Sequence, residues 1–265
     1  MKRLLLVLLA LAALPQPRHI TAQGRGTLTI AAASDLQTAL PQIVDGFERT
    51  SGAKATVTFG SSGNFFAQIQ NGAPFDVFLS ADADYPRRLA EAREMDEGSL
   101  YEYAAGGLVL WTRNDSKINI AQGLTVVRGA QVRRIAIANP AVAPYGRAAV
   151  SALRSAGLID AVEKKLVYAE TVALAAQLVQ SGNADVALIG HAVALGAALR
   201  ATGHFVDVPA SMHPRIAQVA GIVSASRNKE NARAFIDYLK SPAATAVLQS
   251  FGFSVPAAAG RRGRT

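Results

Sequence analysis

The stretch KATVTFGSSGNFFAQIQNGAPFDVFLSAD, residues 54–82, contains a strand, a helix and a second strand in direct succession. Residues 54–59 alternate polar and apolar side chains, as a half-buried strand does, and the glycine-flanked turn GSSG follows at once. Residues 64–72 have helical spacing and end on Asn71 and Gly72, and residues 75–82 are again a strand. Strands that alternate with helices at this spacing predict right-handed crossovers and a mostly parallel sheet.

Four segments place hydroxyl or backbone N–H donors just after a predicted strand, at or near the start of a helix. They are LTIAAASDL (28–36), TVTFGSSGN (56–64), IAIANPAVAPYG (135–146) and VYAETVALA (167–175). Helix starts carry unpaired N–H groups and a partial positive charge, so four of them facing one cleft would hold a small anion without any Lys or Arg. Each segment taken alone is better explained by an ordinary helix cap or turn.

Two long strands divide the chain. GLVLWTR (107–113) and QVAGIVSAS (218–226) bracket an inner strand–helix series, which indicates that the chain crosses into a second lobe and returns. We therefore predict an α/β fold of two lobes, each a mostly parallel sheet flanked by helices. Lobe one comprises residues 27–108 plus 220–256, and lobe two comprises residues 109–219. Ligands of open parallel sheets bind beyond the carboxyl ends of the strands, which here means the cleft between the lobes.

The two ends of the chain have a composition of their own. Residues 1–22 combine a basic start, an eleven-residue apolar run from Leu4 to Leu14 and a cleavage point after Ala22, as a signal peptide does. Residues 257–265 form an Arg-rich tail. The apolar run is shorter than the roughly 20 residues that a membrane-spanning helix needs. We expect an exported, soluble, periplasmic protein that acts as a monomer.

The charge of the chain is concentrated at these ends. The formal net charge is +8, but Lys2, Arg3 and Arg18 lie in the leader and three arginines lie in the tail, which leaves the body close to neutral. A body without a basic stripe or interleaved aromatic side chains argues against nucleic-acid binding. The chain has no cysteine, so disulfides, thiolate metal sites and a lipid-modified N-terminal cysteine are all excluded.

Motifs of the common enzyme classes are missing from the sequence. It contains no G-x-S-x-G elbow, no phosphate loop and no G-x-G-x-x-G at a helix start. Ser226 and Lys229 match S-x-x-K, but the companion motifs of penicillin-recognising enzymes are absent. His191, His204 and His213 have no partner at metal-ligand spacing. We predict a binding protein with no catalytic residues and no cofactor.

Five motifs together resemble the periplasmic molybdate-binding proteins of ABC importers, which belong to the type II, two-lobed solute-binding proteins. The motifs are AAASDL, FGSSGNFFAQIQNGAPFDVFLSAD, NPAVAPYGRAA, AETV and the closing FIDYLKSP with FGF, and the resemblance covers residues 28–253. It implies capture of molybdate or tungstate for a cognate inner-membrane permease. The nearest alternative is a binding protein for another tetrahedral oxyanion such as sulfate or phosphate. Sugar sites need stacking aromatic side chains, and amino-acid sites need an arginine and an acid. The four turns contain neither.

The resemblance also implies which residues contact the ligand. Ser34 and Ser62 would contribute hydroxyl and N–H donors, and Tyr145 and Val172 would contribute N–H groups; all four contact the oxyanion and not a bare metal ion. Some family members add a tyrosine where this chain has Gly190. The branch without that tyrosine uses the residue after the first serine, here Asp35, whose side chain must then point away from a dianion.

Overall fold

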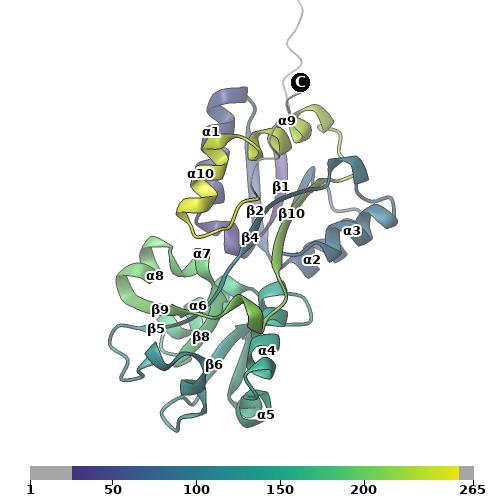
Figure 1. The fold of residues 1–265 in the computed structure, drawn as a ribbon. Coiled ribbons are helices and arrows are strands. Elements are labelled where there is room, and N and C mark those ends of the chain that lie inside the picture. Colours follow the sequence, from purple (N-terminus) through teal and green to yellow (C-terminus); the bar gives the residue numbers. More distant parts are fainter. Residues whose placement is uncertain (1–25, 257–265) are drawn as a thin grey trace, which may run out of the picture.

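The computed structural model describes residues 26–256, so the predicted signal peptide (1–22) and the predicted tail (257–265) lie outside the described residues. Two lobes stand one above the other, each built on its own five-stranded sheet (Figure 1). The predicted two-lobed α/β fold is confirmed. No helix in residues 26–256 combines the length and apolar character that crossing a bilayer requires.

The first lobe combines the start and the end of the described chain. Its sheet has the order β2-β1-β3-β10-β4. Its elements are β1 (Leu28–Ala33), the 3₁₀ turn η1 (Ser34–Gln37), α1 (Leu40–Ser51), β2 (Ala55–Gly60), α2 (Ser62–Gln70), β3 (Val77–Ser80), α3 (Asp84–Glu91), η2 (Glu97–Ser99), β4 (Tyr101–Gly106), β10 (Ile216–Ile222), α9 (Lys229–Leu239) and α10 (Pro242–Ser250).

The second lobe lies between the two crossings of the chain, and its sheet has the order β7-β6-β8-β5-β9. Its elements are β5 (Leu108–Arg113), η3 (Ile120–Arg128), β6 (Ile135–Ala138), α4 (Pro144–Ser155), α5 (Ile159–Val162), η4 (Glu163–Lys165), β7 (Leu166–Ala169), α6 (Val172–Gln180), β8 (Val186–Gly190), α7 (His191–Ala194), α8 (Ala197–Thr202), β9 (Gly203–Asp207) and η5 (Ala210–Met212).

Both sheets are mostly parallel, with a single reversed strand each. In the first sheet β10 runs antiparallel to its neighbours β3 and β4, while β1, β2 and β3 pair in parallel. In the second sheet β5 runs antiparallel to β8 and β9, while β6 pairs in parallel with β7 and β8. The reversed strands are the ones with which the chain enters each sheet after crossing. The carboxyl ends of β1, β2, β6 and β7 lead into the four donor segments.

Local sequence explains where the helices begin and end. Leu40, Ile43 and Phe47 form the buried face of α1, and Gly52 ends that helix at φ 70°, a left-handed conformation that glycine adopts without strain. The chain forms two helices between Lys229 and Ser250, because Ser241 caps a new helix that starts at Pro242. Strands β4 and β9 were not anticipated from the sequence.

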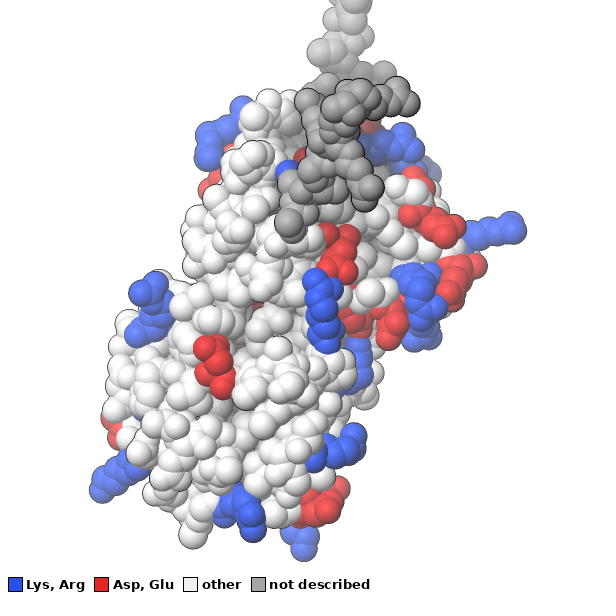
Figure 2. Space-filling model, viewed as in Figure 1, with Lys and Arg blue, Asp and Glu red and all other residues white. Residues whose placement is uncertain are grey.

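The face of the molecule in Figure 2 carries basic and acidic side chains interspersed at its edges and in its middle, with uncharged areas between them. No field of one sign covers this face. The distribution agrees with the nearly neutral body expected from the sequence.

Candidate functional site

The five predicted ligand residues line one small cavity between the lobes. Ser34, Asp35 and Ser62 contribute from the first lobe, and Tyr145 and Val172 from the second. The remaining lining residues are small or compact: Ala33, Gly60, Ser61, Ala81, Ala143 and Pro144. No Lys or Arg is among the lining residues, so any charge on a ligand here is met by hydroxyl and amide donors alone.

The two serines at the start of α2 have different roles. Ser61 is the N-cap, and its Oγ accepts a hydrogen bond from the N–H of Asn64 at 3.4 Å. Ser62 is the first helical residue and is completely buried. Its Oγ accepts from the N–H of Ala81 at 3.0 Å, which leaves the hydroxyl proton free to be donated elsewhere. Its own N–H has no acceptor within the helix.

The second lobe offers two helix starts of the same kind. Tyr145 follows Pro144 in the first turn of α4, and the cap residue Ala143 has no side-chain acceptor to offer. Val172 opens α6, where the Thr171 hydroxyl caps the helix by accepting from the N–H of Leu174 at 3.2 Å. The N–H groups of Tyr145 and Val172 therefore have no acceptor in their own helices. Both residues border the cavity.

The turn after β1 also lines the cavity. Ser34 and Asp35 open the 3₁₀ turn η1, and both are buried. No side-chain oxygen caps this turn, because the cap position is Ala33. The small side chain of Ala33 also lets a ligand approach the backbone closely.

The Asp35 side chain lies in a buried network with the crossing strand β10. Its Oδ2 accepts a hydrogen bond from Gln218 Nε2 at 2.9 Å, and the Tyr103 hydroxyl donates to Gln218 Oε1 at 3.1 Å. Asp35 is 0% exposed. Burial raises the pKa of Asp35 to about 6, although hydrogen bonds from Tyr145 and Gln218 act in the opposite direction.

The ring of Tyr145 occupies the space beside Gly190. A Cβ atom at Gly190 would lie 3.0 Å from two ring carbons of Tyr145, and one at Gly106 would collide with the Tyr145 hydroxyl. The side chain is 2% exposed and points toward Asp35 and not into bulk solvent. An aromatic side chain at position 190 and one at position 145 would therefore exclude each other, which gives a steric reason for glycine at 190.

Direct contacts hold the two lobes together around the cavity. The N–H of Gly63 donates to the carbonyl of Val142 at 2.8 Å, and the Asn64 amide donates to Glu170 at 2.7 Å. Thr38 Oγ1 donates to the carbonyl of Ala192 at 3.1 Å on the opposite side. The lobes are thus in a closed arrangement. The cavity between them has a volume of about 10 Å³.

An ion pair at the rim completes the closure. The Arg147 guanidinium, one turn into α4, pairs with Asp82 of the first lobe and donates to the Tyr85 hydroxyl at 3.2 Å. Burial raises the pKa of Asp82, while the charge of Arg147 opposes that rise. Arg147 is therefore committed to the opposite lobe and is not part of the anion cavity.

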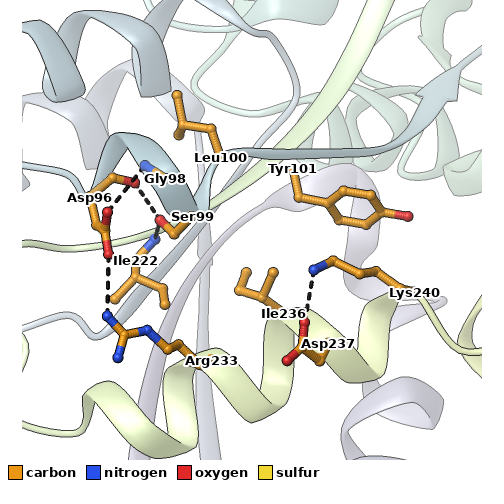
Figure 3. Close-up of a pocket in the computed structure, with 10 residues that line it drawn as sticks. All are labelled: Asp96, Gly98, Ser99, Leu100, Tyr101, Ile222, Arg233, Ile236, Asp237 and Lys240. Atoms are coloured by element: carbon orange, nitrogen blue, oxygen red, sulfur yellow. Dashed lines mark hydrogen bonds and ion pairs between the residues drawn. The ribbon is translucent and has the colours of Figure 1, made fainter.

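A larger hollow of about 320 Å³ lies at the rim, lined in part by Asp82, Pro144 and Arg147, and another lies away from the cleft. The hollow in Figure 3, about 410 Å³, lies beside α9 in the first lobe, and its charged side chains are paired with one another. Arg233 lies 3.7 Å from Asp96, and Lys240 lies 2.8 Å from Asp237 (Figure 3). Residues 26–256 contain no group of three or more His, Asp or Glu side chains that could hold a metal ion.

A family profile described as bacterial extracellular solute-binding protein matches residues 28–254. This chain belongs to that family. Among the relatives of this solute-binding protein, the molybdate-binding protein ModA of Azotobacter vinelandii is 36% identical over 247 residues, covering 90% of this chain and 97% of that protein. ModA of Rhodobacter capsulatus is 32% identical and covers 86% and 88% of the two chains.

Solved structures agree with these sequence relatives. The periplasmic molybdate-binding protein of Azotobacter vinelandii superposes with a TM-score of 0.81 at 34% identity, over 87% of this chain and 100% of that one. The sulfate-binding protein SubI of Mycobacterium tuberculosis, at 15% identity and a TM-score of 0.70, shares the fold. The predicted resemblance to molybdate-binding proteins is confirmed.

Several residues around the cavity were not identified from the sequence. Gln218 donates to the Asp35 carboxyl, and Tyr103 in turn donates to Gln218. Asp82 and Arg147 join the rim. Gln218 did carry a signal, since it is a polar residue in an otherwise apolar strand and is completely buried. The partners themselves could not be read from the sequence, because Gln218 and Asp35 are 183 residues apart.

Replacing Asp35 with asparagine should change how stability depends on pH. A pKa raised from 3.8 to about 6 by folding means that ionised Asp35 opposes folding above about pH 6 and does not below pH 3.8. At 1.36 kcal/mol per unit, the free energy of unfolding of Asp35→Asn should rise relative to wild type by about 2.5 kcal/mol between pH 4 and pH 8. Urea unfolding of ligand-free protein across this range measures the difference. A difference that does not vary with pH would contradict the assignment.

Proposed function

We propose that this protein captures molybdate or tungstate between its lobes and presents it to the permease of an ABC importer. The observation that carries the proposal is the meeting of hydroxyls and unpaired helix-start N–H groups from both lobes at one cavity without a basic side chain. The ModA relatives, which are molybdate-binding proteins, support the choice of ligand.

The donors available are sufficient for useful affinity. Ser34, Asp35 and Ser62 would bind the anion from one lobe, and Tyr145 and Val172 from the other. Hydrogen bonds to a charged group contribute about 1.5–3 kcal/mol each, so five to seven give roughly 8–20 kcal/mol. Lost freedom and lobe ordering cost about 4–15 kcal/mol, which leaves room for micromolar to nanomolar binding.

Neutral donors at fixed positions also provide selectivity. A buried Lys or Arg would bind any anion strongly. Hydroxyls and amides held at fixed positions by two rigid lobes instead discriminate between anions by their size. A site that offers only donors disfavours a protonated ligand, because the ligand O–H would find no acceptor. Selection of molybdate over the smaller sulfate or the partly protonated phosphate follows from these two properties.

We further propose that residues 1–22 export the chain to the periplasm and that it acts there as a soluble monomer, without a cofactor and without catalysing a reaction. The relatives are molybdate-binding proteins. Closure around the ligand is the state that a permease would recognise.

A melting scan tests the ligand. At 100 times its Kd, a ligand adds about 2.7 kcal/mol to the free energy of unfolding, which raises the Tm by about 5–10 °C for a chain of this size. We expect this rise with molybdate and tungstate and little change with sulfate or phosphate at equal concentration. A larger rise with sulfate would instead support the alternative oxyanion.

The Ser62 hydroxyl should contribute strongly to affinity. Removing one donor to a charged group in Ser62→Ala should weaken molybdate binding about 10- to 100-fold, because the proton that Ser62 has free is the one that would bind the anion. Ser250→Ala, an exposed serine of α10, is the matched control and should bind like wild type. Isothermal titration measures both. Equal affinities for the two variants would remove Ser62 from the site.

The rim ion pair should act on release of the ligand. Arg147→Gln removes a partly exposed interlobe pair worth up to about 1 kcal/mol, so the molybdate dissociation rate should rise by up to about fivefold. The association rate should change less. Arg87→Gln, which breaks pairs with Asp84 and Glu91 inside the first lobe, is the control and should leave release unchanged. Stopped-flow fluorescence measures the rates, and faster release in both variants would argue against a rim role.

A further inference from the structure

Asp35 lines the anion cavity, and its carboxyl has no positive partner. Its recorded interactions are with Gln218, Tyr145 and the backbone N–H groups of Asp35 and Leu36, and none is with a basic side chain. Arg147, two residues after Tyr145 in α4, pairs with Asp82 at the rim and not with Asp35. A completely buried carboxylate without a counter-charge is an unfavourable arrangement even before a ligand arrives.

Two polar atoms meet behind the cavity without a regular hydrogen bond. Within the described residues, Asp35 Oδ1 and the Tyr145 hydroxyl are both buried and neither has a partner of good geometry. The Tyr145 hydroxyl is nevertheless close enough to the Asp35 carboxyl to affect its protonation. Burial and the charge of Asp35 raise the pKa of Tyr145 well above its usual value, so this hydroxyl keeps its proton. A proton on Asp35 would give Oδ1 a hydrogen to donate to the tyrosine oxygen.

A dianion in the cavity makes ionised Asp35 still less favourable. Like charges within a few ångströms in a desolvated site raise the pKa of a carboxyl, and the neutral donors around the cavity do not reduce the net charge. This step rests on the proposed function. We propose that Asp35 is protonated in the closed, anion-loaded protein, so that capture of each dianion takes up one proton from solution.

The other titratable groups packed around η1 are two tyrosines, a histidine and the charged residues of α1. Tyr103 and Tyr145 face the carboxyl from β4 and α4 and remain protonated. Helix α7 brings His191, whose imidazole lies 3.7 Å from Asp207. The charged residues of α1 lie at its exposed side or end: Asp45, Glu48 and Arg49. Strands β1 and β2 and helix α6 contain no titratable side chain.

Titration calorimetry in buffers of different ionisation enthalpy measures the proton count. With sodium molybdate, and separately with sodium tungstate, wild-type protein should take up more than about half a proton per anion near pH 7.5 and almost none near pH 5. The Kd should rise by up to about tenfold per pH unit above pH 6, the slope that uptake of one proton gives. These pH values follow from a carboxyl that titrates at about 6 in the free protein.

Three variants locate the proton. Asp35→Asn should abolish the uptake and make the Kd independent of pH. Asp45→Asn, an exposed acid of α1, is the matched control and should keep both. Tyr145→Phe retains the carboxyl but removes the hydroxyl that acts to lower the pKa of Asp35, so the uptake should persist and begin at a higher pH.

The outcomes separate the two proposals. Absence of any molybdate or tungstate binding contradicts the proposed function. Binding without proton uptake at any pH from 5 to 8.5 overturns the inference and leaves the proposed function intact. Uptake that survives unchanged in Asp35→Asn also overturns it, because the proton then belongs to another group. The wild-type titration alone is decisive if a variant does not fold.

Discussion

Backbone N–H groups that their own helices cannot satisfy meet between the two lobes, and the rest of the site depends on that meeting. Helices α2, α4 and α6 all begin at the cavity, with Ser62, Tyr145 and Val172 in their first turns. In each helix the cap oxygen is either used by a residue deeper in the turn or missing. A buried N–H without an acceptor is unfavourable, so an acceptor in the cavity adds to the stability of the closed lobes. An oxyanion has the required lone pairs on all sides.

The topology links this site to the crossings between the lobes. Strand β10 returns the chain to the first sheet and carries Gln218, which holds Asp35. Gly106 ends β4 just before the chain enters the second sheet, and it leaves room for the hydroxyl of Tyr145. Asp35 and Tyr145 thus border the cavity on one side and reach the crossing segments on the other. Movement of the lobes and occupancy of the cavity act on the same two residues.

Much of this arrangement could be predicted from the sequence because its determinants are local. The glycine-flanked serines at 61 and 62, the capping Thr171 and the apolar runs before them identify strand ends and helix starts within a few residues. The family resemblance then distinguished Ser62, a donor, from Ser61, a cap, which spacing alone left open. The reversed strands and the Asp35–Gln218–Tyr103 network depend on contacts between distant residues, and no local pattern encodes the partner of a buried polar side chain.

The position of Asp35 is the least expected feature of a site meant for dianions, and its surroundings explain how it is tolerated. An asparagine there would accept from Gln218 equally well and would carry no charge, so a carboxyl adds nothing to the hydrogen bond at Oδ2. What a carboxyl adds is a state that depends on the ligand: ionised when the cavity has no second charge, and neutral when a dianion is present. Because Tyr145 belongs to the other lobe, a proton shared between Asp35 and Tyr145 would also join the lobes at the moment the anion binds. Above about pH 6 the carboxyl therefore opposes closure around an empty cavity, and it opposes closure around a dianion more strongly, because a proton must first be taken up. Capture of the anion then depends on pH, which a permanently neutral side chain at position 35 would not cause.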